Sequence, residues 1–118
     1  MTLQRGVVAL ARFPHASGGR GKKRPVVVIQ SDVYNAGSRH FIVAEITTNL
    51  SVANDPSSLL IEVATPDGQA TGLAQDSVVT CLHLATMSGD RLGDVIGQLS
   101  PDLLLKVDAC LKAALGLP

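Results

Sequence analysis

Short runs of apolar and β-branched residues divide the chain, and loops containing glycine or proline separate them. Val, Ile, Phe and Thr fit the pleated, half-buried surface of a sheet, so each run predicts a β-strand. At five to eight residues, the runs are shorter than a typical helix. This feature restricts the chain to a mostly β fold. The predicted strands cover residues 6–13, 25–30, 41–48, 59–63, 77–84 and 94–99.

The C-terminal residues follow a different pattern, which predicts one helix. Ser100 suits the N-cap, Pro101 the first helical position and Gly116 the stop. Apolar residues recur between them at spacings of three and four: Leu104, Val107, Leu111 and Ala114. The expected fold is a small, mostly antiparallel, SH3-like β-barrel closed by this helix. We expect residues 1–118 to form a single domain.

Composition excludes several classes of protein. Hydrophobic residues make up 46% of the 118 residues and charged residues 17%, which excludes intrinsic disorder. Cys81 and Cys110 stand in apolar surroundings without metal-ligand spacing, so we expect reduced core residues. No apolar run approaches the ~20 residues of a membrane span, and no signal segment is present. We therefore expect a cytoplasmic protein without a membrane partner.

The formal net charge of zero hides an asymmetry. Residues 1–40 contain seven basic side chains and one acid, whereas residues 41–118 contain three basic side chains and nine acids. A zero total argues against a nucleic-acid-binding protein, but a basic first part indicates an anionic partner. The alternative is that the two parts interleave in one fold and the charges cancel locally.

The basic residues concentrate in one glycine-rich loop between the first two predicted strands. Cations on such a loop would contact phosphates of a nucleic acid. Alternatively, they only keep the loop soluble. No Gly-Lys-Ser/Thr ending is present, so this is not a nucleotide-binding P-loop. The candidate RNA-binding residues here are His15, Arg20, Lys22 and Lys23.

Arg24 differs from the other cations because it directly precedes Pro25 and a buried strand, which fixes its backbone. A fixed guanidinium can stabilise negative charge on a phosphoryl oxygen. Thr47 and Thr48 end the neighbouring strand and offer hydroxyls to the same phosphate, although β-propensity alone would also place threonines there. His15 is a candidate acid or base, or a surface residue, and His83 a candidate for a hydrogen bond at the sheet edge. No histidine pair has metal-ligand spacing, so we expect no metal or cofactor.

Two blocks of sequence, KRPVVVIQSDVYN at residues 23–35 and IVAEITTN at residues 42–49, resemble the MazF/PemK family of toxin endoribonucleases. Residues 72–87 and 91–100 also fit, in order, so the similarity spans nearly the whole chain. The resemblance implies an SH3-like barrel that forms a homodimer. It implies metal-independent, sequence-specific cleavage of single-stranded RNA, often mRNA, held in check by an antitoxin. It places the catalytic residues at Arg24 and Thr47.

The sequence also departs from the family pattern. Val7 stands where many members carry an acid, and Leu82 and Ala85 stand where members often carry an acidic or polar residue and an arginine. The replaced acidic, polar and arginine side chains are candidates for acid and base in the family, so these departures leave the acid and base of this chain unassigned. Tyr34 is the one candidate for stacking on bases, or else a buried structural residue. Two alternatives to a ribonuclease therefore stay open: a non-catalytic, gyrase-binding toxin on the related CcdB fold, and a catalytically silent homologue that only binds an antitoxin.

Overall fold

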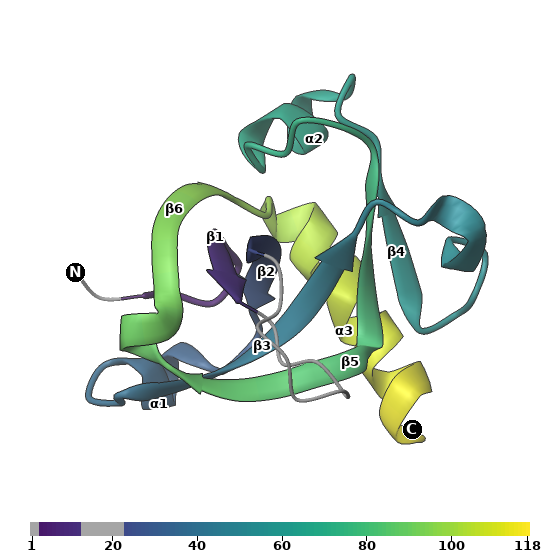
Figure 1. The fold of residues 1–118 in the computed structure, drawn as a ribbon. Coiled ribbons are helices and arrows are strands. Elements are labelled where there is room, and N and C mark those ends of the chain that lie inside the picture. The colour runs from purple at the N-terminus through teal and green to yellow at the C-terminus, as the bar shows by residue number, and fades with distance from the viewer. Residues whose placement is uncertain (1–2, 13–22) are drawn as a thin grey trace.

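The computed structural model describes residues 3–12 and 23–118 (Figure 1). Six strands form one antiparallel sheet in the order β4-β5-β3-β2-β1-β6. All six predicted strands are present, so the mostly β prediction is confirmed. The strands are β1 (Val7–Arg12), β2 (Lys23–Val28), β3 (His40–Thr47), β4 (Ser58–Ile61), β5 (Ser77–Ser88) and β6 (Leu92–Gln98).

Short helices occupy the connections between strands, and one long helix ends the chain. Residues 32–35 and 66–70 each form a short helical turn, capped by the side chain of Ser31 and of Thr65 respectively. Strand β5 continues to Ser88, beyond the predicted end at Leu84, because its second half pairs with the start of β3. The helices are α1 (Asp32–Asn35), α2 (Pro66–Ala70) and α3 (Pro101–Leu115), with 3-10 turns η1 (Leu50–Val52) and η2 (Gly89–Arg91).

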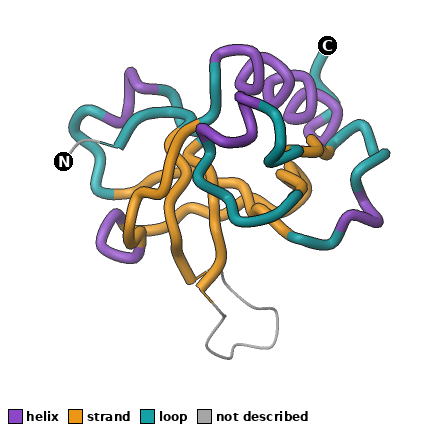
Figure 2. The backbone as a smooth tube through the Cα atoms, turned by 90° about the horizontal axis from the view of Figure 1, so that it is seen from above, coloured by secondary structure: helices purple, strands orange, loops and turns teal. Residues whose placement is uncertain are grey.

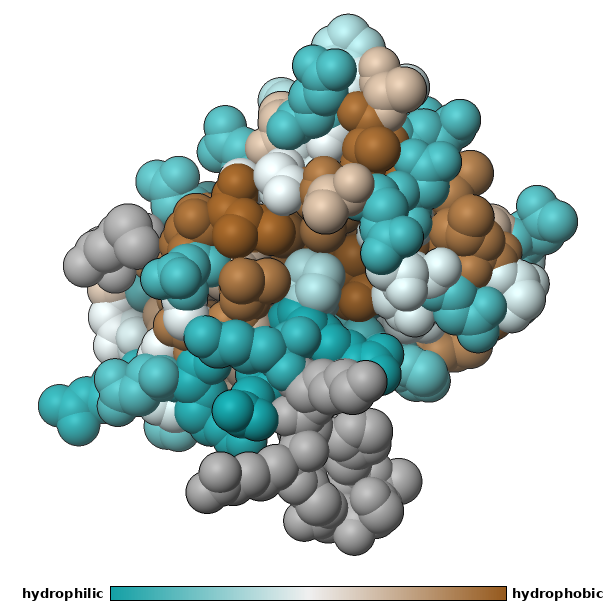
Figure 3. All heavy atoms as spheres, turned by 45° about the horizontal axis from the view of Figure 1, so that its top comes forward, coloured by the Kyte–Doolittle hydropathy of each residue, from teal (hydrophilic) through white to brown (hydrophobic). Residues whose placement is uncertain are grey.

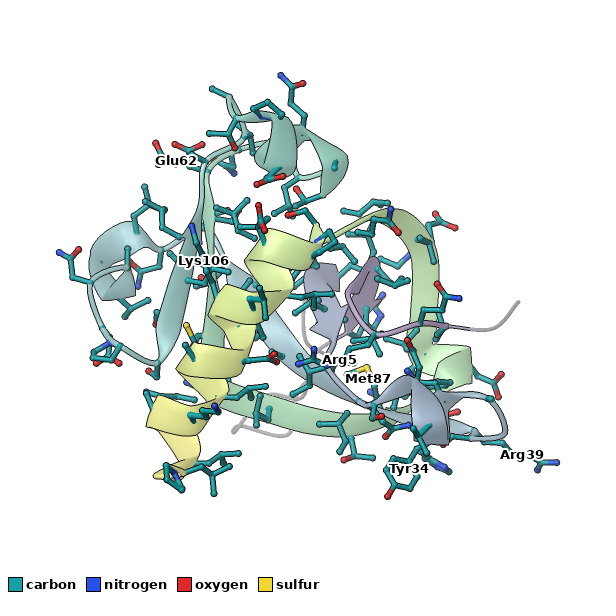
Figure 4. All side chains as sticks on the ribbon, turned by 180° about the vertical axis from the view of Figure 1, so that it is seen from behind. Arg5, Tyr34, Arg39, Glu62, Met87 and Lys106 are labelled. Carbon is teal, nitrogen blue, oxygen red and sulfur yellow. The ribbon has the colours of Figure 1, made fainter. Side chains whose placement is uncertain are left out.

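Helix α3 has the predicted caps. The hydroxyl of Ser100 accepts a hydrogen bond from the backbone N–H of Leu103, and Gly116 ends the helix with a left-handed φ of 69°. The helix crosses one face of the sheet, where it contacts β4 and β5 (Figures 2 and 4). Its buried face thus closes the core on that side.

The two faces of the sheet bury separate apolar clusters. On the helix side, side chains of β1, β2, β3 and β5 pack against α3, with Val27 and Val107 fully buried. Strands β5 and β6 bend, so that the other face of the sheet is concave (Figure 1). This concave face has its own cluster, formed by Ala11, Val26, Val28, Phe41, Val43, Met87 and Leu92. Strand alternation explains why neighbours such as Val26 and Val27 enter different clusters.

The barrel is open, which corrects one detail of the predicted fold. Strands β4 and β6 are the two edges of the described sheet and do not pair with each other. The segment that follows α2 packs against β6 instead. A Cβ at Gly72 would lie 1.9 Å from the carbonyl oxygen of Ile96, and one at Gly97 would lie 2.4 Å from that of Ala70. Glycine at both positions permits this close backbone contact. The contact occupies the edge of β6 where a pairing strand would otherwise lie.

The two cysteines are free and buried, as predicted. Both belong to the apolar cluster beneath α3. Burial, together with the neighbouring Cys110, raises the pKa of Cys81 to about 12. The thiols therefore remain protonated and contribute to the core as small apolar side chains.

Candidate functional site

The register of strands β2 and β3 predicts that Arg24 and Thr47 lie across from each other. Val26 of β2 pairs with Glu45 of β3, and antiparallel registers run in opposite directions. Two further residues along each strand bring Arg24 opposite Thr47. Side chains two residues apart on a strand point to the same face of the sheet. Arg24 therefore shares the concave face with Val26, and Thr47 shares it with Glu45. Opposite positions in such a pair have Cα atoms about 4.5–5.5 Å apart, close enough for both side chains to reach one phosphate.

Glu45, on β3, is a carboxylate of this site that was not among the residues predicted from the sequence. Glu45 Oε1 accepts a hydrogen bond from Arg24 Nη1 at 3.3 Å, and Glu45 Oε2 lies 3.0 Å from His83 Nδ1. The side chain of Glu45 is 14% exposed, against 39% for Arg24 and 60% for His83. Glu45 therefore holds two partly exposed, basic side chains from a half-buried position. An acid inside the otherwise apolar FIVAEITT run, two residues before Thr47, was the available sequence signal.

An irregularity in β5 brings His83 to this carboxylate. Ala44 pairs with Leu84, but the next residue of β3, Glu45, pairs with Thr80. The register shift leaves residues 81–83 of β5 outside the ladder, as in a β-bulge, a feature that often re-aims side chains beside active sites. His83 turns toward Glu45, and Leu82 is left exposed. His83 has the predicted hydrogen bond, with Glu45 as partner, but β5 lies between β4 and β3 and not at the edge of the sheet as predicted.

A pocket of about 580 Å³ opens beside these residues. This volume lies within the range of pockets that hold small ligands. One wall is made by Glu45, Thr47 and His83, and the facing wall comes from the segment between β3 and β4. Its full lining is Glu45, Thr47, Asn49, Ser51, Val52, Asn54, Asp55, Pro56, Ser58, Thr80, Leu82 and His83. The lining offers hydroxyls and amides for hydrogen bonds and apolar side chains for contact with a base.

Local hydrogen bonds fix the facing wall. Thr47 Oγ1 accepts from the backbone N–H of Asn49 at 3.1 Å, and the Asn49 side chain accepts from the N–H of Ser51. The Asp55 carboxylate accepts from the hydroxyl and then the backbone N–H of Ser57, and these bonds lower the pKa of Asp55. The Thr47 hydroxyl keeps its own proton for donation to a ligand, since it acts as acceptor in the bond that holds it.

The other predicted binding residues are not gathered in this pocket. Thr48 points to the opposite face of the sheet from Thr47 and lines a second pocket of about 330 Å³. Lys23 extends alongside β6, where its Nζ lies 3.9 Å from a Cβ built at Gly93. His15, Arg20 and Lys22 lie outside the described residues. Of the two predicted cations that the structure describes, Lys23 and Arg24, the β2–β3 register brings Arg24 toward Thr47.

Two prominent side chains lie away from the site. Tyr34 is exposed on α1, which precedes β3, whereas Thr47 is at the far end of that strand (Figure 4). Arg5 is structural: its guanidinium donates to the carbonyl of Ile29 and pairs with Asp108, so it joins β2 to α3. Neither side chain contributes to the pocket.

The surface around the strands mixes hydrophobic and hydrophilic side chains. In the view of Figure 3, hydrophobic atoms gather across the middle of the face and hydrophilic atoms surround them. Within residues 3–12 and 23–118, no three His, Cys, Asp or Glu side chains are close enough to hold a metal ion. No helix in this described part is long and apolar enough to cross a membrane.

The comparisons with known proteins identify the family. The sequence model of the family described as "PemK-like, MazF-like toxin of type II toxin-antitoxin system" matches residues 4–115. The chain belongs to this family. Endoribonuclease MazF6 of Mycobacterium tuberculosis is 34% identical over 119 residues, covering 99% of this chain and 100% of the relative. Endoribonuclease EndoA of Bacillus subtilis is 35% identical over 118 residues, covering 99% of this chain and 97% of the relative.

Solved structures of MazF-like proteins have the same fold. An endoribonuclease from a mycobacterial species aligns with a TM-score of 0.78 at 21% identity, covering 100% of this chain and 95% of its own. MazF from Deinococcus radiodurans aligns with a TM-score of 0.76 at 19% identity, covering 99% of both chains. A mycobacterial endoribonuclease in complex with its cognate antitoxin gives 0.74 at 22% identity, covering 98% of this chain and 97% of its own. These alignments confirm the fold that the resemblance implied.

Three departures from the MazF/PemK pattern have defined places in this structure. Val7 and Ala85 pack against the concave apolar cluster. Leu82 is 61% exposed and lines the pocket. An apolar side chain therefore occupies the pocket position where the family pattern favours an acidic or polar one, and His83 is the neighbouring side chain that can exchange a proton.

Proposed function

We propose that Arg24 and Thr47 form the reaction centre of a toxin endoribonuclease that cleaves single-stranded RNA. The observation that supports this proposal is the antiparallel register of β2 and β3, which, continued beyond the Val26–Glu45 pair, puts Arg24 opposite Thr47, a residue that lines the pocket. Curated relatives at 34–35% identity over nearly the whole chain are named endoribonucleases, and these relatives give no support to the gyrase-binding alternative. Residues 1–118 act as one toxin domain in this proposal.

The reaction uses a nucleophile supplied by the RNA itself. The 2′-OH attacks the adjacent phosphorus, the bond to the 5′-oxygen breaks, and the products carry a 2′,3′-cyclic phosphate and a 5′-OH. The attack concentrates negative charge on the non-bridging oxygens, which the Arg24 guanidinium stabilises. One N–H of Arg24 is used by Glu45, and the remaining donors of its planar fork face no described carboxylate. The Thr47 hydroxyl donates to one non-bridging oxygen and so orients the phosphate.

This chemistry determines which nucleic acid is cleaved. DNA lacks the 2′-OH, so it binds without being cut. An internal nucleophile does not require a metal-activated water, and we propose cleavage without metal or cofactor. Recognition of a short mRNA sequence falls to the pocket wall between β3 and β4, where Asn49 and Asn54 present amide groups.

The predicted RNA-binding residues extend the contact along the strand. We propose that Arg20, Lys22 and Lys23 contact phosphates on either side of the cleavage site, together with His15 and Thr48. Each phosphate contact releases counterions, so affinity falls as salt rises. Binding of a fluorescent RNA to the Arg24→Ala variant, measured from 50 to 200 mM salt, tests this. A salt-independent affinity would refute the phosphate contacts.

Its partners follow from the same assignment. We propose a cognate antitoxin as partner, because a mycobacterial endoribonuclease with this fold has been solved in complex with its cognate antitoxin, and MazF of Deinococcus radiodurans has been solved with MazE. We also propose a homodimer, as the family resemblance implies, and a cytoplasmic location, where mRNA is accessible. Analytical ultracentrifugation of the purified chain tests the dimer, and a monomer at micromolar concentration would exclude it.

Cleavage in the presence of a chelator tests the function as a whole. The purified protein is incubated with a long transcript in EDTA, and the fragments are mapped and probed for their ends. We expect discrete cuts that leave 5′-OH ends available to polynucleotide kinase, and no cutting of the same sequence as DNA. RNA that stays intact over hours, or fragments with 5′-phosphates, would refute the proposed reaction.

A further inference from the structure

The Glu45 carboxylate has a second partner that the proposed reaction does not yet use. Its Oε1 binds Arg24, and its Oε2 lies 3.0 Å from Nδ1 of His83. Neither bond is local in sequence, because Glu45 is 21 residues from Arg24 and 38 residues from His83. Two strand contacts and the irregular stretch of β5 are needed to bring these three side chains together. The arrangement is therefore built by the fold.

The bond to Glu45 determines which ring nitrogen of His83 carries the proton. An ionised carboxylate has only acceptors to offer, so Nδ1 must donate to it. In the neutral ring, Nε2 then holds the free lone pair. Nε2 lies on the far side of the ring from Glu45, and no described residue bonds it. The His83 side chain is 60% exposed and lines the pocket, so this lone pair is accessible to a ligand there.

His83 also stands at the proposed site of reaction. Glu45 and Thr47 lie two residues apart on one face of β3, about 7 Å along the strand. Thr47 and His83 line the same pocket. A phosphate between Arg24 and Thr47 would therefore have the His83 imidazole beside it, on the side that Glu45 fixes. A carboxylate, an oriented imidazole and a guanidinium are the groups needed to accept a proton and stabilise phosphoryl charge.

We infer that His83 is the general base of the RNA cleavage and that Glu45 is its positioning residue, an assignment that rests on the proposed function. Nε2 of His83 takes the proton from the 2′-OH. The resulting O2′ forms a bond to phosphorus, and the bond from phosphorus to the 5′-oxygen breaks. The 5′-oxygen leaves with the electron pair and takes a proton from water. His83 returns to the neutral ring by releasing its proton to solvent.

The charged groups around His83 fit this role. Glu45 on β3 lies directly against the ring, and Arg24 on β2 binds the other oxygen of the same carboxylate. Asp55, before β4, is the remaining acid in the lining of the pocket. The two carboxylates stabilise the imidazolium that forms when the 2′-OH gives up its proton, and Arg24 stays directed at the phosphate. The ring can thus gain and lose a proton within one cycle.

Cleavage kinetics of matched variants test the base. The substrate is a short oligoribonucleotide spanning the site that the parent cleaves fastest, assayed in EDTA from pH 5 to 9. We expect His83→Gln to lower kcat by about 10²–10⁴-fold with a small change in KM, and to abolish the rise of kcat between pH 5 and 8. Added imidazole should restore part of the activity of His83→Ala, because the exposed site admits it.

A second histidine gives a matched control. His40 is exposed at the start of β3 and lines a different pocket. His40→Gln should cleave at the parent rate with the parent pH profile. If His83→Gln also keeps the parent rate and profile while Arg24→Ala is inactive, the inference about His83 fails and the proposed function stands. If the parent does not cleave RNA at all, the proposed function fails, and the base assignment fails with it.

Nitrogen NMR tests the positioning role without relying on activity. In ¹⁵N-labelled protein above pH 8, the imidazole nitrogens of His83 should show a protonated Nδ1 and an unprotonated Nε2. Glu45→Ala should abolish this preference and lower kcat more than KM changes, while circular dichroism confirms the fold. A His83 ring that carries its proton on Nε2 in the parent would refute the role of Glu45, whatever the kinetics show.

Discussion

Replacing Arg24 with alanine separates catalysis from stability in this chain. The guanidinium has five N–H donors, and Glu45 uses one of them at 3.3 Å. No described side chain accepts from the others, so they are left for the phosphate that we place between Arg24 and Thr47. Loss of one donor to developing charge costs about 10²–10³ in kcat. Because Arg24 supplies both the donors and the positive charge, we expect Arg24→Ala to lose at least that factor.

The stability of the same variant should change little. The Arg24 side chain is 39% exposed, so solvent screens its ion pair with Glu45, which contributes less than about 1 kcal/mol. Glu45 also keeps its bond to His83 after the substitution. For a domain of this size, a loss of about 1 kcal/mol corresponds to a decrease in Tm of roughly 3–5 °C. A folded protein with very low activity is therefore the expected result.

Single-turnover cleavage of an end-labelled RNA in EDTA, with thermal unfolding followed by circular dichroism, measures both quantities. Arg39→Ala is the matched control, because it removes the same charge from an exposed position away from the pocket (Figure 4). Arg24→Lys keeps the charge but loses the planar fork, and it should recover only a small part of the activity. If Arg24→Ala cleaves within about tenfold of the parent, or if Arg39→Ala loses as much, the assignment of Arg24 is wrong.

Three further predictions concern the fold. Burial raises the pKa of Cys81 to about 12, so we expect no reaction with iodoacetamide at pH 8 until the protein unfolds, as followed by mass spectrometry. Hydrogen bonds, first from the backbone N–H of Arg5, lower the pKa of Asp32 below its usual 3.8. The unfolded chain therefore binds that proton first, and stability is lost as pH falls from about 4; Asp32→Asn should flatten this loss in urea titrations at pH 2–5. Gly72→Ala meets a positive φ and a backbone oxygen 1.9 Å from the new Cβ, so it should cost more than about 2 kcal/mol of unfolding free energy, whereas Gly37→Ala meets nothing within 4 Å and should be neutral. Equal midpoints for the two glycine variants would contradict the close backbone contact.

The elements of this fold are encoded in short stretches of sequence. A short run of apolar and β-branched residues specifies a strand, and a capping serine followed by proline and apolar residues at helical spacing specifies α3. These signals depend on neighbouring residues, so the six strands and the helix were predictable. Arg24 and Thr47 were predictable as candidates for the same reason, since Arg24 directly precedes one predicted strand, Thr47 lies at the end of another, and both offer the required chemistry.

Tertiary structure decided which side chains meet. Sequence placed Thr47 and Thr48 together, but alternation along β3 sends them to opposite faces and into different pockets. Glu45 and His83 meet only because the register of β5 shifts by several residues beside β3. A register shift depends on pairing between distant strands, and no local pattern encodes it. The barrel opens at β4 and β6 for a similar reason, because a close contact between distant backbone segments replaces strand pairing.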